Sequence, residues 1–285
     1  MRLWDFVIGN GMTWQETSAE TQTLLNAVDL SELGKQDIWH QLRTIVQVQP
    51  DSDIFPVRGK YEDSEQYTIG LNYLSADFPM WFTLADCIAS KLLTGKTPKV
   101  IKAYSFSPKE PQFALWPVNI MGNPDYRVDP TKDDFYRRLI DLRMAVRKKG
   151  RAGTKVDADK TESEQLALKI LANATSYGIF VELNVNDLAR QQSAVRYGLS
   201  EKPVRIPCDK LEEPGKYFHP LLGTLITGAA RLMLAIAETL ARQHGLDWAF
   251  CDTDSMALAK PDGMTTGDFD RHTKSICSWF KPLNP

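Results

Sequence analysis

The sequence is poor in cysteine, in long apolar runs and in net charge, and each shortage excludes a class of protein. Its four cysteines form no Cys-x-x-Cys pair and have no histidine at ligand spacing: Cys87, Cys208, Cys251 and Cys277. This scatter argues against a disulfide framework and a zinc site, and favours reduced thiols in a cytoplasmic protein. No uninterrupted apolar run is long enough to cross a bilayer, and no secretion signal opens the chain, so we expect no membrane partner.

The remaining composition is that of an ordinary globular protein. The chain has 285 residues, a formal net charge of −2, 43% hydrophobic and 25% charged residues, enough for one large domain or two modest ones. The charge is uneven, because residues 137–160 carry nine Lys or Arg against three Asp, a local balance of +6. Such a segment suits phosphate contacts, and a solvated charged face is the alternative explanation.

Hydrophobic periodicity and turn residues predict an α+β chain. In the first third we expect helices at 13–29 and 80–93, a strand pair at 44–48 and 54–58, the second an edge because of Pro56, and strands at 67–73 and 99–106. After a proline-rich connection at 108–130, we expect an antiparallel helical hairpin at 132–149 and 162–177, broken at 150–154. Strands at 179–185 and 204–208 and a helix at 221–242 follow, and the apolar face of that helix carries Leu225, Leu232, Ile236 and Leu240.

An acidic tetrapeptide, Asp252-Thr253-Asp254-Ser255, separates the two largely apolar runs of the stretch 248–259. This pattern predicts a β-hairpin with both carboxylates at its tip, held still by strands that are buried on both faces. Residues i and i+2 of a strand point to the same side, so Asp252 and Asp254 aim at one small volume. Two anions so close favour a hard divalent cation, and magnesium fits best because it takes one or two carboxylates and completes its shell with water and substrate phosphates. A solvated acidic turn is the alternative.

The second helix of the hairpin ends in polar residues at helical spacing. Lys169 and Asn173 are four residues apart and share one face, while Tyr177 and Gly178 at the exit provide an aromatic plate and a place for close backbone approach. That face suits a triphosphate with a stacked nucleotide. The alternative is a helix that ends in a Gly C-cap, with Tyr177 packed on the sheet.

Together these residues resemble a known family. The spacing Lys-x3-Asn-x3-Tyr-Gly, followed some 75 residues later by Asp-Thr-Asp-Ser, is similar to the fingers and palm signatures of family B DNA polymerases, and 227–231 resembles their palm helix. The resemblance covers roughly residues 130–260 and implies a palm-type antiparallel sheet with packed helices and an inserted helical-hairpin fingers subdomain. It implies a palm-associated region at 1–130, fingers at 131–178, and a palm with the Asp-Thr-Asp hairpin at 179–285.

The resemblance also implies roles for single residues. Asp254 would bind two Mg²⁺ ions directly, with Asp252 beside it in support. Lys169 and Asn173 would hold the incoming deoxynucleoside triphosphate, and Tyr177, followed by Gly178, would lie against its sugar. Phosphate contacts from the basic helix would come from Arg143 and Arg147, which are one turn apart. The implied partners are a DNA primer–template and deoxynucleoside triphosphates.

Two departures from the family pattern qualify these roles. The family often has Asn-Ser-x-Tyr-Gly, whereas one extra residue separates Asn173 from Tyr177, which rotates one of them unless a π-bulge absorbs the insertion. The family also supplies a second metal-binding aspartate in an Asp-x-x-Ser-x-Tyr-Pro segment, and the nearest candidates, Asp5 and Asp77, do not continue into that pattern.

The second departure leaves two functions open. We expect this chain to be an internal piece of a longer polymerase, without exonuclease-like or thumb-like segments, whose remainder supplies the second aspartate. On this reading the reaction is template-directed nucleotidyl transfer by two metal ions. The alternative is a non-catalytic nucleic-acid-binding remnant of a polymerase.

Overall fold

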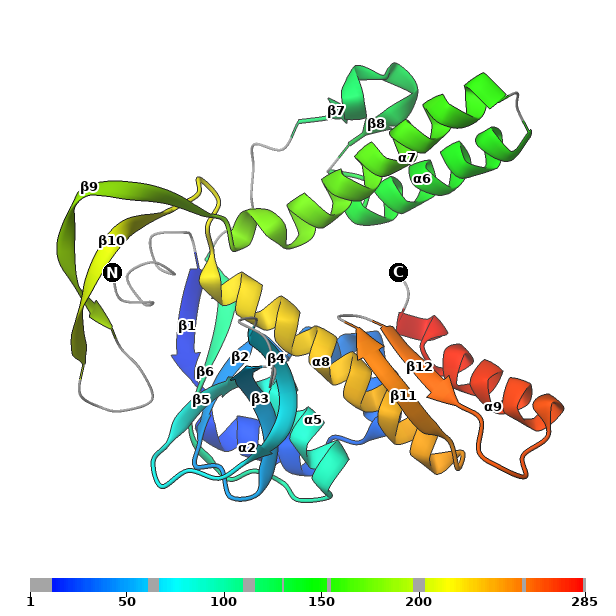
Figure 1. Cartoon of the computed structure of the whole chain (residues 1–285). Helices are drawn as coiled ribbons and strands as arrows, with labels where there is room; N and C mark the ends of the chain where they lie inside the picture. Colours follow the sequence, from blue (N-terminus) through cyan, green and yellow to red (C-terminus); the bar gives the residue numbers. More distant parts are fainter. Residues whose placement is uncertain are drawn as a thin grey trace. The chain divides into compact units, whose positions relative to one another are not determined.

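The computed structural model describes residues 12–60, 67–109, 116–129, 131–152, 155–196, 203–252 and 255–283. The fold is α+β with antiparallel strand pairs, as the sequence predicts (Figure 1). Two compact units divide the chain: unit 1 contains residues 1–111 and 224–285, and unit 2 contains residues 112–223. The three-part division at 130 and 178 follows functional boundaries and stays a prediction.

Unit 1 contains a four-stranded antiparallel sheet with two helices on one face. The strand order is β1 (Met12–Glu16), β6 (Val100–Pro108), β2 (Thr44–Val48) and β5 (Met80–Thr83). Helices α2 (Ser18–Ala27) and α5 (Leu84–Thr94) contact each other and the strands, so both lie on the same face. Their buried side chains, which include Leu25, Leu84 and Ile88, form part of the unit 1 core.

Two predicted helices of unit 1 begin later than expected. The helix predicted at 13–29 begins at Ser18, because residues 12–16 pair with β6 as an edge strand. The helix predicted at 80–93 begins at Leu84, after the short strand β5. Thr83 caps this helix: its hydroxyl accepts from the Asp86 amide at 3.0 Å, and the Asp86 carboxylate accepts from the Thr83 amide at 3.2 Å.

The strand pair predicted at 44–48 and 54–58 is wrong. Both segments are strands, but β2 pairs with β5 and β6, while β3 (Asp53–Lys60) pairs with β4 (Tyr67–Leu74) in a separate two-stranded sheet. Because β2 is a central strand with both edges occupied, it cannot also pair with β3. The position of β3 is determined by side-chain packing and not by pairing with β2. Phe55 of β3 is fully buried and stacks on Phe82, with 3.9 Å between the ring centroids.

Helix α8 (Pro220–Gln243) confirms the predicted helix at 221–242, and three of its four predicted apolar residues are buried: Leu232, Ile236 and Leu240. By length and composition alone α8 could cross a membrane. However, one side of it packs into the unit 1 core. Arg231 interrupts its apolar sequence and pairs with Asp86 at 2.6 Å. The structure therefore suggests no membrane.

The remaining elements of unit 1 are short helices and a terminal helix. They are α3 (Leu30–Leu33), α4 (Gln36–Trp39), α9 (Thr266–Trp279) and the 3₁₀ turn η4 (Lys281–Leu283). The sequence analysis missed α9. A local signal was available, because Thr265 caps α9 through a hydrogen bond from the Asp268 amide to its hydroxyl at 3.1 Å, as a Thr-x-x-Asp pattern predicts.

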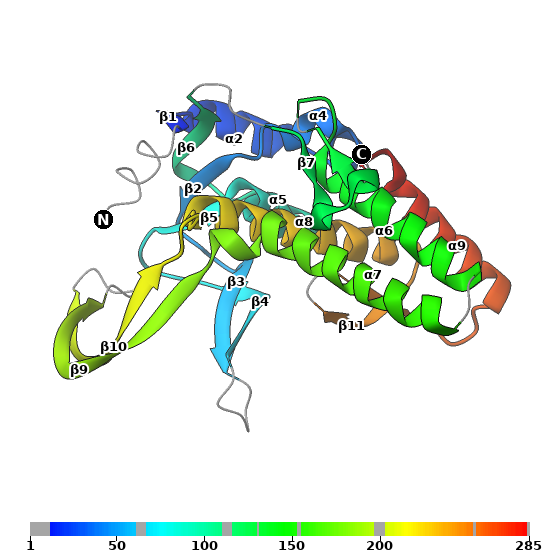
Figure 2. The ribbon, with the colours of Figure 1, turned by 90° about the horizontal axis from the view of Figure 1, so that it is seen from above.

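Unit 2 contains the predicted helical hairpin, α6 (Phe135–Ala152) and α7 (Lys155–Ser176), whose helices lie side by side in Figures 1 and 2. Its core is formed by Ile120, Tyr126, Val128, Leu139, Leu142, Val146 and Leu168. The predicted break at 150–154 is wrong in part, since Gly150 is helical. A Cβ at Gly150 would lie 2.4 Å from Thr161 Cγ2, so this glycine permits close packing of the two helices.

Short elements replace the expected proline-rich connection: β7 (Val118–Asn119), η1 (Ile120–Gly122), η2 (Pro124–Tyr126) and β8 (Arg127–Val128). After α7, η3 (Gly178–Phe180) leads into a long antiparallel ribbon of β9 (Leu183–Arg196) and β10 (Val204–Pro214) (Figure 2). The strand predicted at 179–185 therefore begins later, and both ribbon strands are longer than predicted. Most of their side chains are exposed, so an alternation of apolar and polar residues in the sequence could not show how long these strands are.

Candidate functional site

The predicted acidic hairpin forms in unit 1. Strands β11 (Asp247–Asp252) and β12 (Ser255–Ala259) are antiparallel, and Asp252 pairs with Ser255 in the register. The two residues between them are therefore the connection at the tip. Thr253 and Asp254 lie outside the described residues, and the structure describes only the backbone of Asp252.

The expectation that both hairpin strands are buried on both faces is wrong. The side chains of β11 from Asp247 to Cys251 are exposed, and the exposed fractions reach 40% for Trp248 and 59% for Phe250. Strand β12 is mostly half-buried, and Leu258 packs against the unit 1 core. Only one side of this two-stranded sheet packs on the core. A prediction from the apolar residues alone therefore overestimated the burial of β11.

Cys251 is the thiol nearest in sequence to the acidic tip. Desolvation raises the pKa of this thiol, and the negative charge of Glu238 raises it further. The thiol is therefore protonated at neutral pH and is a poor metal ligand. This leaves carboxylate oxygens as the only anionic ligands that the hairpin sequence offers to a cation.

The predicted triphosphate face of α7 is exposed to solvent. Lys169 and Asn173 are exposed, and Tyr177 has an exposed fraction of 38%. The Tyr177 amide donates to the Asn173 carbonyl at 3.2 Å, which is regular α-helical bonding, and α7 contains no π turn. The extra residue is thus not absorbed by a π-bulge, and the spacing of four places the Lys169 and Asn173 side chains on one face of α7.

The C-cap alternative for Gly178 does not describe this helix end. Gly178 is not among the described glycines with positive φ, and a Cβ there would meet only the Asn173 carbonyl oxygen, at 3.7 Å. Helix α7 ends at Ser176, and Tyr177 leaves helical geometry with φ −144° and ψ −50°. The half-exposed Tyr177 ring lies near Gly223 and is not buried on a sheet.

Arg143 and Arg147 lie on the exposed surface of α6, whose buried positions are Leu139, Leu142 and Val146. Two contacts define the antiparallel register of α6 and α7. The Tyr136 hydroxyl donates to the Thr175 carbonyl at 2.8 Å, and Gly150 packs on Thr161. Both contacts give the same register, which puts Arg143 level with Leu168, one residue before Lys169.

The side on which each polar residue projects follows from helix geometry. Counting about 100° per residue from the buried positions places Arg143 and Arg147 on one flank of α6. Helix α7 runs antiparallel to α6, so the rotation per residue has the opposite sense when both helices are viewed from one end. Counted in this way, Lys169 and Asn173 lie on the same side of the helix pair as the two arginines. We call these four residues the polar side of the helical hairpin. The same count places the exposed Glu162 on this side as well, so three cations, one amide and one carboxylate give it a net positive charge that suits an anionic ligand.

The candidate residues fall into both units. Asp252 and Asp254 belong to unit 1, whereas the polar side of the helical hairpin belongs to unit 2. Of the two candidates for the second aspartate, Asp77 is exposed in the segment before β5, and Asp5 lies outside the described residues. Among the described residues, no three His, Cys, Asp or Glu side chains cluster to hold a metal.

Comparison with protein-family models, with curated proteins and with solved structures found no match to this chain. The comparisons therefore give no test of the resemblance to family B DNA polymerases, which depends on the residue pattern.

Proposed function

We propose that this chain contains the fingers and part of the palm of a family B-like DNA polymerase, and that it takes part in template-directed DNA synthesis. The observation that carries the proposal is the polar side of the helical hairpin, where Arg143, Arg147, Lys169 and Asn173 project together into solvent. The helical hairpin would be the fingers, and β11 and β12, which pair with each other in a two-stranded sheet, would be the catalytic hairpin of the palm.

The residue types suit phosphoryl transfer, which needs cationic clamps and positioning more than covalent catalysis. Lys169 would pair with the triphosphate as a point charge, and Asn173 would donate an amide hydrogen bond to it. Arg143 and Arg147 would offer forked donors that match phosphate oxygens. The half-exposed Tyr177 ring, which directly follows α7, would support the sugar.

Asp254, supported by Asp252, would hold two Mg²⁺ ions, which lower the charge of the reacting phosphates. The connection between β11 and β12 suits this role, because the register leaves only two residues between Asp252 and Ser255 and keeps both aspartates at the tip. The second catalytic aspartate would come from the remainder of the polymerase. A non-catalytic nucleic-acid-binding remnant is the alternative function, and whether a second aspartate completes the site discriminates between the two.

The first test is triphosphate binding by the chain itself. We expect a fluorescent deoxynucleoside triphosphate to bind in the presence of Mg²⁺, and Lys169→Met to weaken binding at least about tenfold, since a charge-assisted contact is lost. Lys148→Met removes an exposed charge from another side of α6 and is the matched control. Equal losses for the two variants would refute a specific triphosphate site.

The second test separates the polymerase from the remnant. Primer extension is measured for the chain alone and for a fusion to an upstream Asp-x-x-Ser-x-Tyr-Pro segment, and we expect activity only in the fusion. In the active fusion, Asp254→Asn should abolish Mg²⁺-dependent extension, and Asp252→Asn should reduce it less. A larger loss for Asp252→Asn would show that the two roles are reversed, and an inactive fusion that still binds DNA would favour the remnant.

A further inference from the structure

Two histidine rings face each other in unit 1, where the end of α8 meets α9. His244 directly follows α8, and its Nδ1 lies 3.0 Å from Nδ1 of His272 on α9. The ring centroids are 4.9 Å apart, and the ring planes are tilted by 45°. Both side chains are half-buried, so water and small ions can reach the pair. The two residues are 28 positions apart in the sequence, so only the tertiary structure shows that they belong together.

The turn that ends α8 fixes the backbone of His244. Gly245 has a φ of 69°, a left-handed conformation that favours glycine. The Gly245 amide donates to the Arg242 carbonyl at 3.0 Å, and the Leu246 amide donates to the Ala241 carbonyl at 2.9 Å. These two bonds form a Schellman motif, and Leu246 is buried in the unit 1 core. His244 therefore keeps its place without any ligand.

Helix α9 fixes the position of His272. Phe269 lies three residues before it and Ile276 four residues after it, so the three side chains share one face of the helix. Ile276 is buried in the unit 1 core, and Phe269 packs against that core. His272 therefore lies at the edge of the packed face, beside His244. Since packed elements hold both rings, little conformational entropy is lost when they bind a common ligand.

The distance between the two nitrogens fits the coordination of one metal ion. An imidazole nitrogen lies about 2.0–2.1 Å from a bound ion such as Zn²⁺, so two such nitrogens are about 2.9 Å apart at a right angle and about 3.4 Å apart at a tetrahedral angle. The observed 3.0 Å is close to the right-angle value. Right angles between ligands are typical of square-planar and octahedral sites, which suit Cu²⁺ and Ni²⁺ with nitrogen and oxygen ligands.

The protonation states of the rings also permit metal binding. Without a metal, one ring donates its Nδ1 hydrogen to the Nδ1 lone pair of the other, and either ring can be the donor. A neutral imidazole can instead carry its hydrogen on Nε2, which frees Nδ1 as a ligand. When both rings do so, two lone pairs are available to one ion and neither ring changes its charge. The C-terminal end of α8 adds a partial negative charge near His244, which favours a cation.

We propose that His244 and His272 form a two-histidine site for a late first-row transition-metal ion, with Ni²⁺ or Cu²⁺ as the best fit. Among the described residues no three His, Cys, Asp or Glu side chains form a metal cluster, so water would complete the coordination. The bound ion would link the end of α8 to α9.

This site is separate from the proposed magnesium site. Strand β11 begins at Asp247, three residues after His244, and the acidic tip follows the far end of the strand, about 17 Å from Asp247. The chemistry differs as well, because Mg²⁺ prefers oxygen ligands and imidazole suits late transition metals. Excess Mg²⁺ should therefore not compete for the two histidines.

The first test is metal binding by the whole chain in excess Mg²⁺, without an affinity tag, DNA or triphosphate. We expect calorimetry to show saturable binding of one Ni²⁺ ion per chain, which should broaden the amide resonances of Gly245 and Thr273 more than those of the helical hairpin. With one equivalent of Cu²⁺, the electron paramagnetic resonance spectrum should show coupling to two imidazole nitrogens. No saturable binding of either ion, or a copper spectrum with a single nitrogen, would overturn the proposal.

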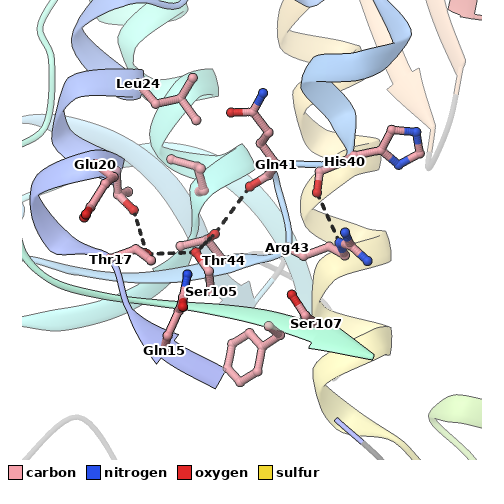
Figure 3. A pocket seen from close by; sticks show the side chains of 13 residues that line it. Gln15, Thr17, Glu20, Leu24, His40, Gln41, Arg43, Thr44, Ser105 and Ser107 are labelled. Carbon is pink, nitrogen blue, oxygen red and sulfur yellow. Dashed lines mark hydrogen bonds between the residues drawn. The ribbon is translucent and has the colours of Figure 1, made fainter. Parts of the chain in front are cut away.

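Histidine variants provide the second readout. His244→Gln and His272→Gln should each weaken Ni²⁺ binding at least about tenfold, because even a hydrogen-bond partner of a metal ligand is typically worth that much in affinity. His40→Gln is the matched control, because His40 is exposed and lines a cavity of about 310 Å³ that neither of the other two histidines lines (Figure 3).

Equal losses in all three variants, or unchanged binding in both site variants, would overturn the proposal. The copper spectrum of the unaltered chain keeps the test decisive if a variant fails to fold. Since no DNA or triphosphate is present, failure here leaves the proposed polymerase function untouched.

Discussion

At the scale of single residues, a buried ion pair joins α8 to α5. Arg231 Nε donates to Asp86 Oδ1 at 2.6 Å, and its terminal amino group donates to Oδ2 at 3.1 Å. Asp86 is almost fully buried and also accepts from the Thr83 hydroxyl at 2.7 Å. A Cβ at Gly228 would lie 2.3 Å from that hydroxyl, so glycine is needed where α8 passes Thr83. The segment that resembles a polymerase palm helix thus has a structural role in unit 1.

Breaking this ion pair should destabilise the protein strongly. We expect Arg231→Met to lower the free energy of unfolding by about 3–5 kcal/mol, because it leaves the buried Asp86 carboxylate without its countercharge. Arg242→Met, on the same helix, breaks a partly exposed pair with Glu238 and should cost less than about 1 kcal/mol. Urea denaturation of the two variants measures the difference, and similar losses would contradict the role of the pair.

His219 should make stability depend on pH. Its Nδ1 accepts a hydrogen bond from the Leu222 amide at 3.3 Å at the start of α8, and burial lowers its pKa. Folded His219 stays neutral where the unfolded chain, with a histidine pKa of about 6.5, already binds a proton. Stability is therefore fully present above about pH 6.5 and falls as the pH drops from that value through the lowered pKa of the folded state.

Denaturation between pH 5 and 8 checks this expectation, with His219→Asn as the reference. Asparagine retains a capping acceptor but does not titrate. The other three histidines are common to both proteins, so the difference between the two curves isolates His219. Parallel pH profiles would show that His219 does not contribute.

At the scale of elements, the helical hairpin carries the positive charge that the proposed function needs. The buried positions of α6 leave Arg143 and Arg147 on one exposed flank, with Arg143 level with Leu168, next to Lys169. Arg137 and Lys148 of the same helix are also exposed, but the same count turns them toward another side. The same net charge can therefore be removed from either side of α6.

Replacing Arg143 and Arg147 together by Gln should weaken DNA binding and flatten its dependence on salt, since fewer counterions are released. Each lost phosphate contact should reduce the salt slope by about 1. The double variant Arg137→Gln, Lys148→Gln should have a smaller effect on both quantities. Fluorescence anisotropy over a salt titration gives the slopes, and indistinguishable slopes would mean that the helix is only a solvated charged face.

Local sequence could predict most elements but not all of their ends. The core of α8 was predictable because its apolar residues recur at helical spacing, and the β11–β12 hairpin because turn residues separate two apolar runs. The starts of α2 and α5 were not predictable from local sequence. Met12–Glu16 and Met80–Thr83 have no helix-breaking residue, and they become strands only by pairing with β6 and β2. The Thr83-x-x-Asp86 capping pattern would have located the second start.

At the scale of the whole molecule, the two units have separate hydrophobic cores. The unit 1 core combines α5 with Leu232 and Ile236 of α8, while the unit 2 core combines α6, α7 and Tyr126. No buried residue is shared by the two clusters described. A core mutation should therefore act mainly on its own unit.

We expect Ile236→Ala to lower amide protection in unit 1, and Leu142→Ala to lower it in unit 2, each by about 2–5 kcal/mol in the free energy of opening. Hydrogen exchange read by mass spectrometry assigns the loss to residues 112–223 or to the rest of the chain. A simultaneous loss in both units from either variant would mean that the units unfold as one.

The sequence by itself determined which residues share a face or a turn. Lys169 and Asn173 share one side of α7, and Asp252 precedes a tight connection, because these relations depend only on spacing within one helix or one hairpin. Tertiary structure decided the strand order β1-β6-β2-β5, the separation of β2 from β3, and the exposure of Phe250 on β11. The physical reason is that strand pairing and burial depend on partners distant in sequence, which neither periodicity nor turn chemistry encodes.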